Sequence, residues 1–401
     1  MANSKSNIRA LVSAGLAAGA TLGALASTVA RQRAGASTSV NPALINWRRA
    51  QGIAAALNRN DPFADTPRAQ FNQYYAAMIK RAAPLVAAAI GSEMPNRVLH
   101  VAVVSRAEWV AANIGSFRQL FAPIERFHAE GLAEEGNSGA IGNLLFGGIN
   151  QALLSAEVGT LLGYLARHVL GQYDLSLLAP EMRSGKLYFV EPNITALQTQ
   201  LGLDPDDFRL WITLHEVTHA YQFEAHAWLR PYFDQLLNEY FDTLREDLGA
   251  LREGALGLRT FIERARSRDK SQGWIEVVMT PQQRDIFQRI QALMTIVEGS
   301  GNYVMNSVGK ELLPSYDYIH ERVEHRQGNR KLIEKLFMRI TGLDIKMEQY
   351  ALGEVFLKHV AEAKGQPFAN LVWRGPDYLP TIEEIKNPDA WIARVAAMQA
   401  G

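Results

Sequence analysis

Apolar residues recur every three or four positions along most of the chain, which is the period of helices with one buried face. The pattern predicts a helix from Pro42, a second from Arg68 that breaks near Pro84, and a long third helix over residues 144–173. After residue 190 almost every segment has this helical period. We therefore expect most of the chain to be helical.

Two short segments have a different pattern, in which β-branched and aromatic residues alternate with others, as in strands. They cover residues 97–104 and 186–190. Together with the helices they predict a mainly α fold of the α+β class, a helical domain with a small β-sheet.

The N-terminal region differs from the rest of the chain. Residues 10–30 contain no charge and are long enough to span a bilayer, but they are mostly alanine and glycine, which insert weakly. A single membrane anchor, a cleaved signal peptide and a soluble leader all stay open. Residues 31–41 have the small and polar composition of a linker. We expect a leader over 1–41, one domain over 42–401, and a cytoplasmic protein that residues 10–30 could attach to a membrane.

Composition excludes several classes of function. The 41 Lys and Arg residues balance 41 Asp and Glu residues, so no excess of positive charge indicates a nucleic-acid partner. The chain has no cysteine, which excludes disulfides, thiolate metal sites and cysteine nucleophiles. With 401 residues, 48% of them hydrophobic, the chain can bury a large core.

The segment His-Glu-Val-Thr-His, residues 215–219, is the strongest chemical signal in the chain. Asp204 and Pro205 provide an N-cap and a first helical residue for the helix that carries it. His215 and His219 lie one helical turn apart on one side, so both imidazoles can bind one Zn²⁺ ion. Glu216 points about 100° away, where it can take a proton from a water molecule. The alternative is two structural histidines that share a helix face.

A zinc site requires a third protein ligand, and we expect it on a later helix. Thr280 and Gln283 form a capping box that starts this helix, and Glu298 follows in an apolar setting. A carboxylate in such a setting is costly unless it is paired or bound to a metal. Asn302, four residues further on, could orient a ligating histidine.

Glu224 and His226 are the rival third ligands, because they lie closer in sequence to the two histidines. A spacing that places a histidine six residues after the second one, with a glycine between, does not fit. Ala225 occupies that position, and His226 is one residue too late.

Four stretches in this order resemble the zincin-like metallohydrolases of bacteria and archaea: "LHEVTHAYQFEAHAWLRPYF", "IVEGSGNYVMNSVG", "GLDIKMEQYALGEVF" and "PTIEEIKNPDAW". These are HExxH-containing hydrolases, one branch of which is associated with deazaflavin-cofactor biosynthesis. The resemblance extends from about Ile45 to the C-terminus. It implies His215 and His219 as zinc ligands, Glu216 as base and Glu298 as third ligand, but it implies no substrate.

Other polar residues near these motifs are candidates for binding substrate or stabilising an oxyanion. His226 stands where a small residue is expected in the family, and it could reach the metal edge or a substrate. For the remaining residues a packing or surface role is at least as well supported by the sequence. They are Arg230, Tyr232, Tyr303, Lys346, Tyr350 and Glu354.

These observations predict a zinc-dependent hydrolase, a peptidase or amidohydrolase, that attacks the carbonyl of a peptide or amide substrate. Two alternatives remain. The protein could bind zinc as a scaffold without turnover, or it could be a membrane-tethered interaction protein with structural histidines.

Overall fold

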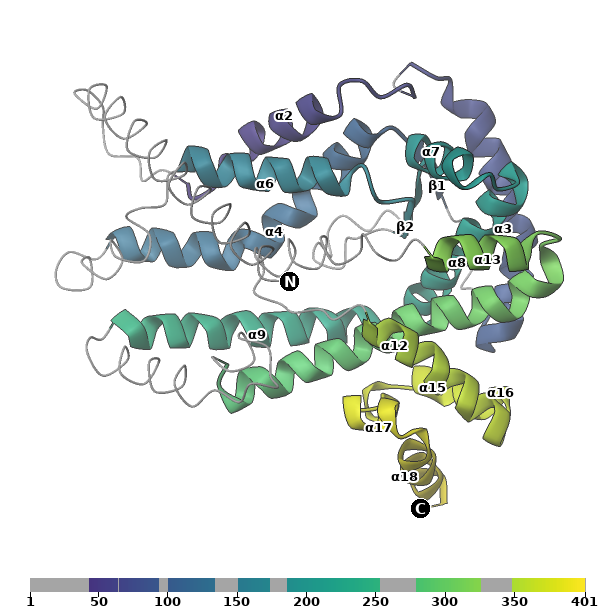
Figure 1. Ribbon diagram of the computed structural model, residues 1–401. Helices are drawn as coiled ribbons and strands as arrows, with labels where there is room; N and C mark the ends of the chain where they lie inside the picture. Colours follow the sequence, from purple (N-terminus) through teal and green to yellow (C-terminus); the bar gives the residue numbers. More distant parts are fainter. Residues whose placement is uncertain are drawn as a thin grey trace, which may run out of the picture. The chain divides into compact units, whose positions relative to one another are not determined.

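The computed structural model describes residues 43–63, 65–93, 100–133, 151–173, 186–252, 279–325 and 348–400. The predicted leader and linker therefore lie outside the described residues, and the division at residue 41 stays a prediction. The described residues form mostly helices, as expected (Figure 1). The α-helices are α2 (Trp47–Leu57), α3 (Arg68–Ile90), α4 (Arg106–Ala133), α6 (Gln151–Leu165), α7 (Glu191–Leu201), α8 (Pro205–Ala225), α9 (Leu229–Arg252), α12 (Pro281–Leu312), α13 (Tyr316–His325), α15 (Glu348–Lys364), α16 (Gln366–Ala369), α17 (Ile382–Lys386) and α18 (Pro388–Ala400).

A three-stranded sheet accompanies the helices, so the predicted fold class is confirmed. Strands β1 (His100–Val104), β2 (Gly171–Tyr173) and β3 (Lys186–Val190) lie in the order β1-β3-β2. β1 pairs with β3 in parallel, with Val104 opposite Val190, and β2 pairs with β3 in antiparallel fashion, with Gly171 opposite Phe189. The expected strand over 186–190 has the predicted bounds. The part of the other expected strand that is described begins at His100.

The prediction of one helix over 144–173 was wrong at its C-terminal end. Helix α6 ends at Leu165, and the last residues of the predicted helix form strand β2. The side-chain amide of Asn193 donates to the carbonyls of Ala166 and Val169, at 2.8 and 2.6 Å. These bonds give the carbonyls partners outside a helix, and the chain then turns to pair with β3.

The predicted break at Pro84 was also wrong, because α3 continues through this residue. Proline removes one backbone hydrogen bond from a helix interior and usually kinks it. Here Ala82, Val86 and Ile90 are at most 2% exposed, so the flanking turns are held by core packing.

Helix α8 packs against α3, α12 and the sheet. Its first turn has the predicted cap, since the Asp204 carboxylate accepts from the backbone N–H groups of Asp206 and Asp207. Phe208, Leu214 and Val217 are fully buried. Burial of this face fixes the rotation of the helix and determines which residues remain at its edge.

None of the helices in the described part of the chain is both long enough and apolar enough to cross a membrane. The segment 10–30, for which an anchor was considered, lies outside that part.

Candidate metal centre

Helix α8 places His215 and His219 at the edge of its buried face. Their side chains are 24% and 11% exposed, whereas Leu214 and Val217 beside them are fully buried. The two Nε2 atoms lie 3.0 Å apart. The four-residue spacing therefore brings both nitrogens to one point, as predicted from the sequence.

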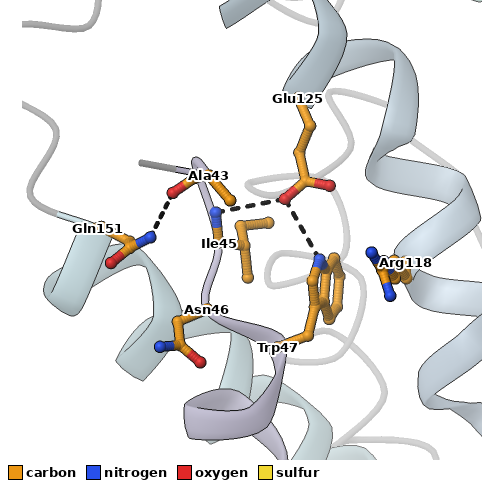
Figure 2. Close-up of a pocket in the computed structure, with 7 residues that line it drawn as sticks. All are labelled: Ala43, Ile45, Asn46, Trp47, Arg118, Glu125 and Gln151. Carbon is orange, nitrogen blue, oxygen red and sulfur yellow. Dashed lines mark hydrogen bonds between the residues drawn. The ribbon is translucent and has the colours of Figure 1, made fainter. Parts of the chain in front are cut away.

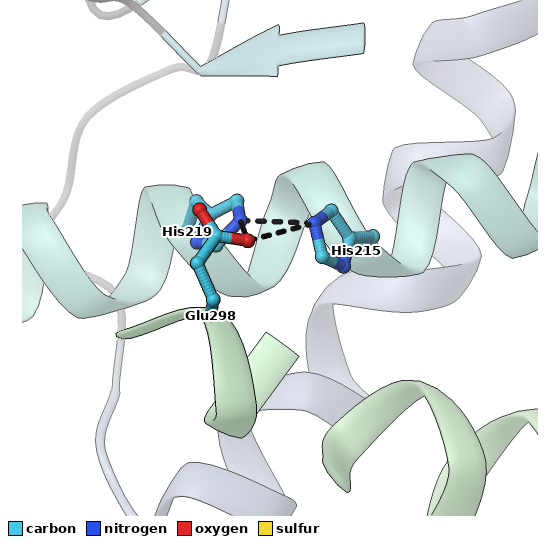
Figure 3. Close-up of side chains that lie close together, drawn as sticks. All are labelled: His215, His219 and Glu298. Carbon is cyan, nitrogen blue, oxygen red and sulfur yellow. Dashed lines mark hydrogen bonds and ion pairs between the residues drawn. The ribbon is translucent and has the colours of Figure 1, made fainter. Parts of the chain in front are cut away.

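Helix α12 brings Glu298 to the same point. Its Oε2 atom lies 3.7 Å from Nε2 of His215 and 3.7 Å from Nε2 of His219 (Figure 3). The predicted capping box starts this helix, because Thr280 and Gln283 exchange side-chain and backbone hydrogen bonds. Among the described residues, these three side chains form a group that could hold a metal ion.

The spacing of the three ligand atoms fits a zinc ion. Two ligand atoms that each lie about 2.1 Å from a tetrahedral zinc ion are about 3.4 Å apart. The distances of 3.0 and 3.7 Å lie on either side of this value. Two imidazoles and one carboxylate are also a donor set that zinc accepts in catalytic sites. The residues present therefore fit the metal.

The side chain of Gln222 connects the two helices at this site. Its Oε1 lies 2.9 Å from Nδ1 of His219, and its amide nitrogen donates to the Val297 carbonyl at 2.9 Å. Gln222 is fully buried. No pattern in the sequence indicated a role for this residue. Asn302, to which we assigned an orienting role, is half-buried on α12, and its role stays a prediction.

Helix α12 approaches the histidines closely because residue 301 is glycine. A Cβ atom at Gly301 would lie 3.0 Å from Cε1 and Nδ1 of His215 and 3.4 Å from Cε1 of His219. Any side chain at position 301 would displace the imidazoles of His215 and His219. Gly301 follows Glu298 by one turn of the same helix, so it sets the distance between the carboxylate and the histidines.

Glu216 lies on the side of α8 that faces the sheet, and it is 6% exposed. Its carboxylate packs against the backbone of Gly171 in β2. A Cβ at Gly171 would come within 2.6 Å of the Glu216 Cγ and Oε1 atoms. The glycine therefore leaves the space that the carboxylate occupies between helix and sheet.

The two rival ligands contact other groups. Glu224 pairs with Arg230 at 3.5 Å. His226 ends α8, and its Nδ1 lies 2.9 Å from the Gln222 carbonyl oxygen while its Nε2 lies 3.3 Å from Oγ of Ser92. Burial lowers the pKa of His226. Both of its ring nitrogens are thus engaged away from His215 and His219.

The remaining candidates also contact neighbouring side chains. The Tyr303 hydroxyl donates to Gln366 Oε1 at 2.6 Å, and burial raises its pKa. The Tyr232 hydroxyl accepts from Arg289 at 3.3 Å, and Glu354 accepts from Asn306 at 2.5 Å. These contacts support packing roles. Lys346 and the side chain of Tyr350, two further candidates, lie outside the described part of the chain.

A cavity of about 310 Å³ lies elsewhere, where the described chain begins (Figure 2). It is lined by Ala43, by residues 45–47, by the first residue of α6, and by Arg118 and Glu125 from α4. The Glu125 carboxylate accepts from Ile45 N–H and Trp47 Nε1–H, both at 3.3 Å. None of the lining residues comes from α8 or α12, so the cavity is separate from the metal centre.

A family model for zincin-like metallopeptidases matches residues 45–392. The chain belongs to this family. This zincin-like protein is also similar to a solved structure from Chloroflexus aurantiacus, described as a putative hydrolase with a novel fold. The two share 40% sequence identity with a TM-score of 0.65, over 88% of this chain and 99% of that chain. No curated protein matches the sequence. Membership of the family and the similar structure both support a hydrolase.

Proposed function

We propose that this zincin-like protein is a zinc-dependent hydrolase that cleaves a peptide or amide bond. The observation that carries the proposal is the spacing of the three ligand atoms of His215, His219 and Glu298, which fits one tetrahedral zinc ion. Two of these residues are fixed by the packing of α8, and the third comes from α12, about 80 positions later in the chain.

Solvent access favours a catalytic site over a structural one. Structural zinc sites have four protein ligands and are closed, whereas catalytic sites have three and keep one position open. Three candidate ligands are present here among the described residues. Their side chains are 24%, 11% and 29% exposed, so a water molecule can reach them.

The four residues have two roles in this proposal, as metal ligands and as general base. When bound, zinc lowers the pKa of a water molecule and polarises a carbonyl group. Glu216 accepts a proton from the attacking water and returns it to the leaving nitrogen. Its carboxylate is confined between α8 and Gly171, so it does not need to be ordered when substrate binds. His215, His219 and Glu298 hold the metal.

Metal content tests the ligand set. The full chain is purified without chelator or added metal and measured by elemental mass spectrometry, together with Glu298→Ala and Glu311→Ala. Glu311 lies on the same helix and is exposed, which makes it a matched control. We expect one zinc per chain in the wild type and the control, and a large loss in Glu298→Ala. Zinc in all three proteins would remove Glu298 from the ligand set.

Turnover tests the proposed catalysis separately. Wild type and Glu216→Gln are compared on a mixed library of peptides and acyl amides, with product detection by mass spectrometry. The glutamine has nearly the same shape and fits beside Gly171, so zinc content should persist while turnover falls by at least about 100-fold. Full activity in this variant would exclude Glu216 as the base. Zinc binding without turnover in the wild type would support a non-catalytic scaffold.

A further inference from the structure

The hydrogen bonds of Gln222 determine which nitrogen of His219 carries its proton. The Val297 carbonyl oxygen can only accept, so the atom of Gln222 that faces it at 2.9 Å must be the amide NH₂. The other end of the side chain is then the oxygen, which lies 2.9 Å from Nδ1 of His219. An amide oxygen can only accept, and Nδ1 must therefore carry a hydrogen.

In the neutral imidazole this assignment leaves Nε2 of His219 without a hydrogen, so its lone pair can accept from Nε2–H of His215 or bind a metal ion. Nε2 is the nitrogen that lies 3.0 Å from His215 Nε2 and 3.7 Å from Glu298 Oε2. We infer that Gln222 is a positioning residue, which holds His219 in the tautomer that can bind a metal ion before any metal arrives. The inference rests on the proposed function, because the metal in question is the zinc of that proposal.

The same side chain also sets the position of Glu298. Val297 directly precedes Glu298 on α12, so the bond from Gln222 fixes this turn of α12 against α8. A fully buried amide with both ends bonded is costly to disrupt, because each lost partner leaves a buried polar group unsatisfied. One residue thus aligns a ligand on its own helix with the ligand on the neighbouring helix.

The two contacts of Gln222 can be separated by substitution. Gln222→Met has a similar volume and removes both contacts, whereas Gln222→Glu keeps an acceptor for His219 and loses the donor to Val297. Gln291→Met is the control, since Gln291 is a buried glutamine on α12 two turns before Glu298. It reports what the same chemical change does to the fold at a distance from the metal centre.

Zinc affinity of the metal-free proteins is measured by titration with Zn²⁺ alone against a fluorescent chelator. Loss of an orienting partner of a metal-ligating histidine lowers metal affinity by about 10–100-fold. We expect this loss in Gln222→Met, a smaller loss in Gln222→Glu, which keeps the contact with His219 but loses the bond to Val297, and no change in Gln291→Met. Wild-type affinity in Gln222→Met would overturn the inference. Equal weakness of both Gln222 variants would assign the whole effect to the bond with Val297, and would overturn the inference that Gln222 acts through the tautomer of His219.

A second measurement needs no variant at position 222. In metal-free wild type with ¹⁵N-labelled histidine, long-range nitrogen–proton spectra should show His219 protonated at Nδ1, with the signal assigned from its absence in His219→Gln. A bare Nδ1 would overturn the inference. If the wild type binds no zinc, the proposed function fails, yet these spectra still decide the tautomer.

Discussion

Replacement of Gly301 by alanine should weaken metal binding without weakening the fold. The added methyl would lie 3.0 Å from His215 Cε1 and Nδ1, so the imidazole must move by a few tenths of an ångström. Ligand distances in a metal site are held to about 0.2 Å, and such a shift should cost at least about ten-fold in zinc affinity, or about 1.4 kcal/mol. Alanine also favours the helix over glycine by about 1 kcal/mol. This gain offsets much of the crowding, which leaves the free energy of unfolding nearly unchanged.

Two other glycines provide the controls for this prediction. A Cβ at Gly309, on the same helix, would lie 3.2 Å from the Tyr316 ring, while a Cβ at Gly52 on α2 would meet nothing within 4 Å. The three alanine variants are compared by chelator competition for zinc and by chemical unfolding. Gly309→Ala should keep wild-type zinc affinity, and Gly52→Ala should add about 1 kcal/mol of stability. Wild-type zinc affinity in Gly301→Ala would refute the reasoning that this contact sets the ligand geometry.

Three further predictions concern the fold around the metal centre. A Cβ at Gly353 on α15 would lie 2.1 Å from the Thr295 carbonyl oxygen, so Gly353→Ala should cost about 3 kcal/mol in chemical unfolding, and a wild-type midpoint would contradict this. Arg209 and Glu191 form a buried ion pair, and their side chains are 10% and 2% exposed. Arg209→Met should lower the free energy of unfolding by about 3–5 kcal/mol, because the carboxylate remains buried without its partner. Burial lowers the pKa of His226, so the stability this neutral side chain contributes is complete above about pH 6.5 and is lost as the pH falls through the lowered pKa. Unfolding free energies between pH 7 and pH 5 should therefore fall less steeply in His226→Gln than in wild type, and equal slopes would count against this assignment.

The parts of the site that depend on one helix could be predicted from the sequence. The cap at Asp204, the proline after it and the spacing of His215 and His219 are local features, and the structure shows the helix where they place it. Glu298 was predicted as the third ligand because a carboxylate among apolar residues needs a partner, although the sequence left Glu224 and His226 as rivals. The packing of α8 against α12 places Glu298 beside the two histidines, whereas Glu224 and His226 contact other groups.

The features that the sequence did not predict depend on contacts between distant segments. Gln222 has no local signal beyond its place three residues after His219, because its second partner is Val297, 75 positions away. Strand β2 was assigned to a helix for the same reason. Its three residues are a strand only because β3 lies beside them and Asn193 binds the carbonyls before them.

Helix α8, which carries His215 and His219, is held by buried contacts near both of its ends. At its start, the Arg209 guanidinium donates to the buried carboxylate of Glu191 on α7. At its end, Gln222 holds it to α12. Sites on rigid elements keep their ligand geometry without the energy of reorganisation, so little should change around His215 and His219 when zinc binds. The buried contacts of α8 therefore form this centre during folding. Zinc should raise the midpoint of unfolding by an amount that grows with the logarithm of its affinity for the preformed site.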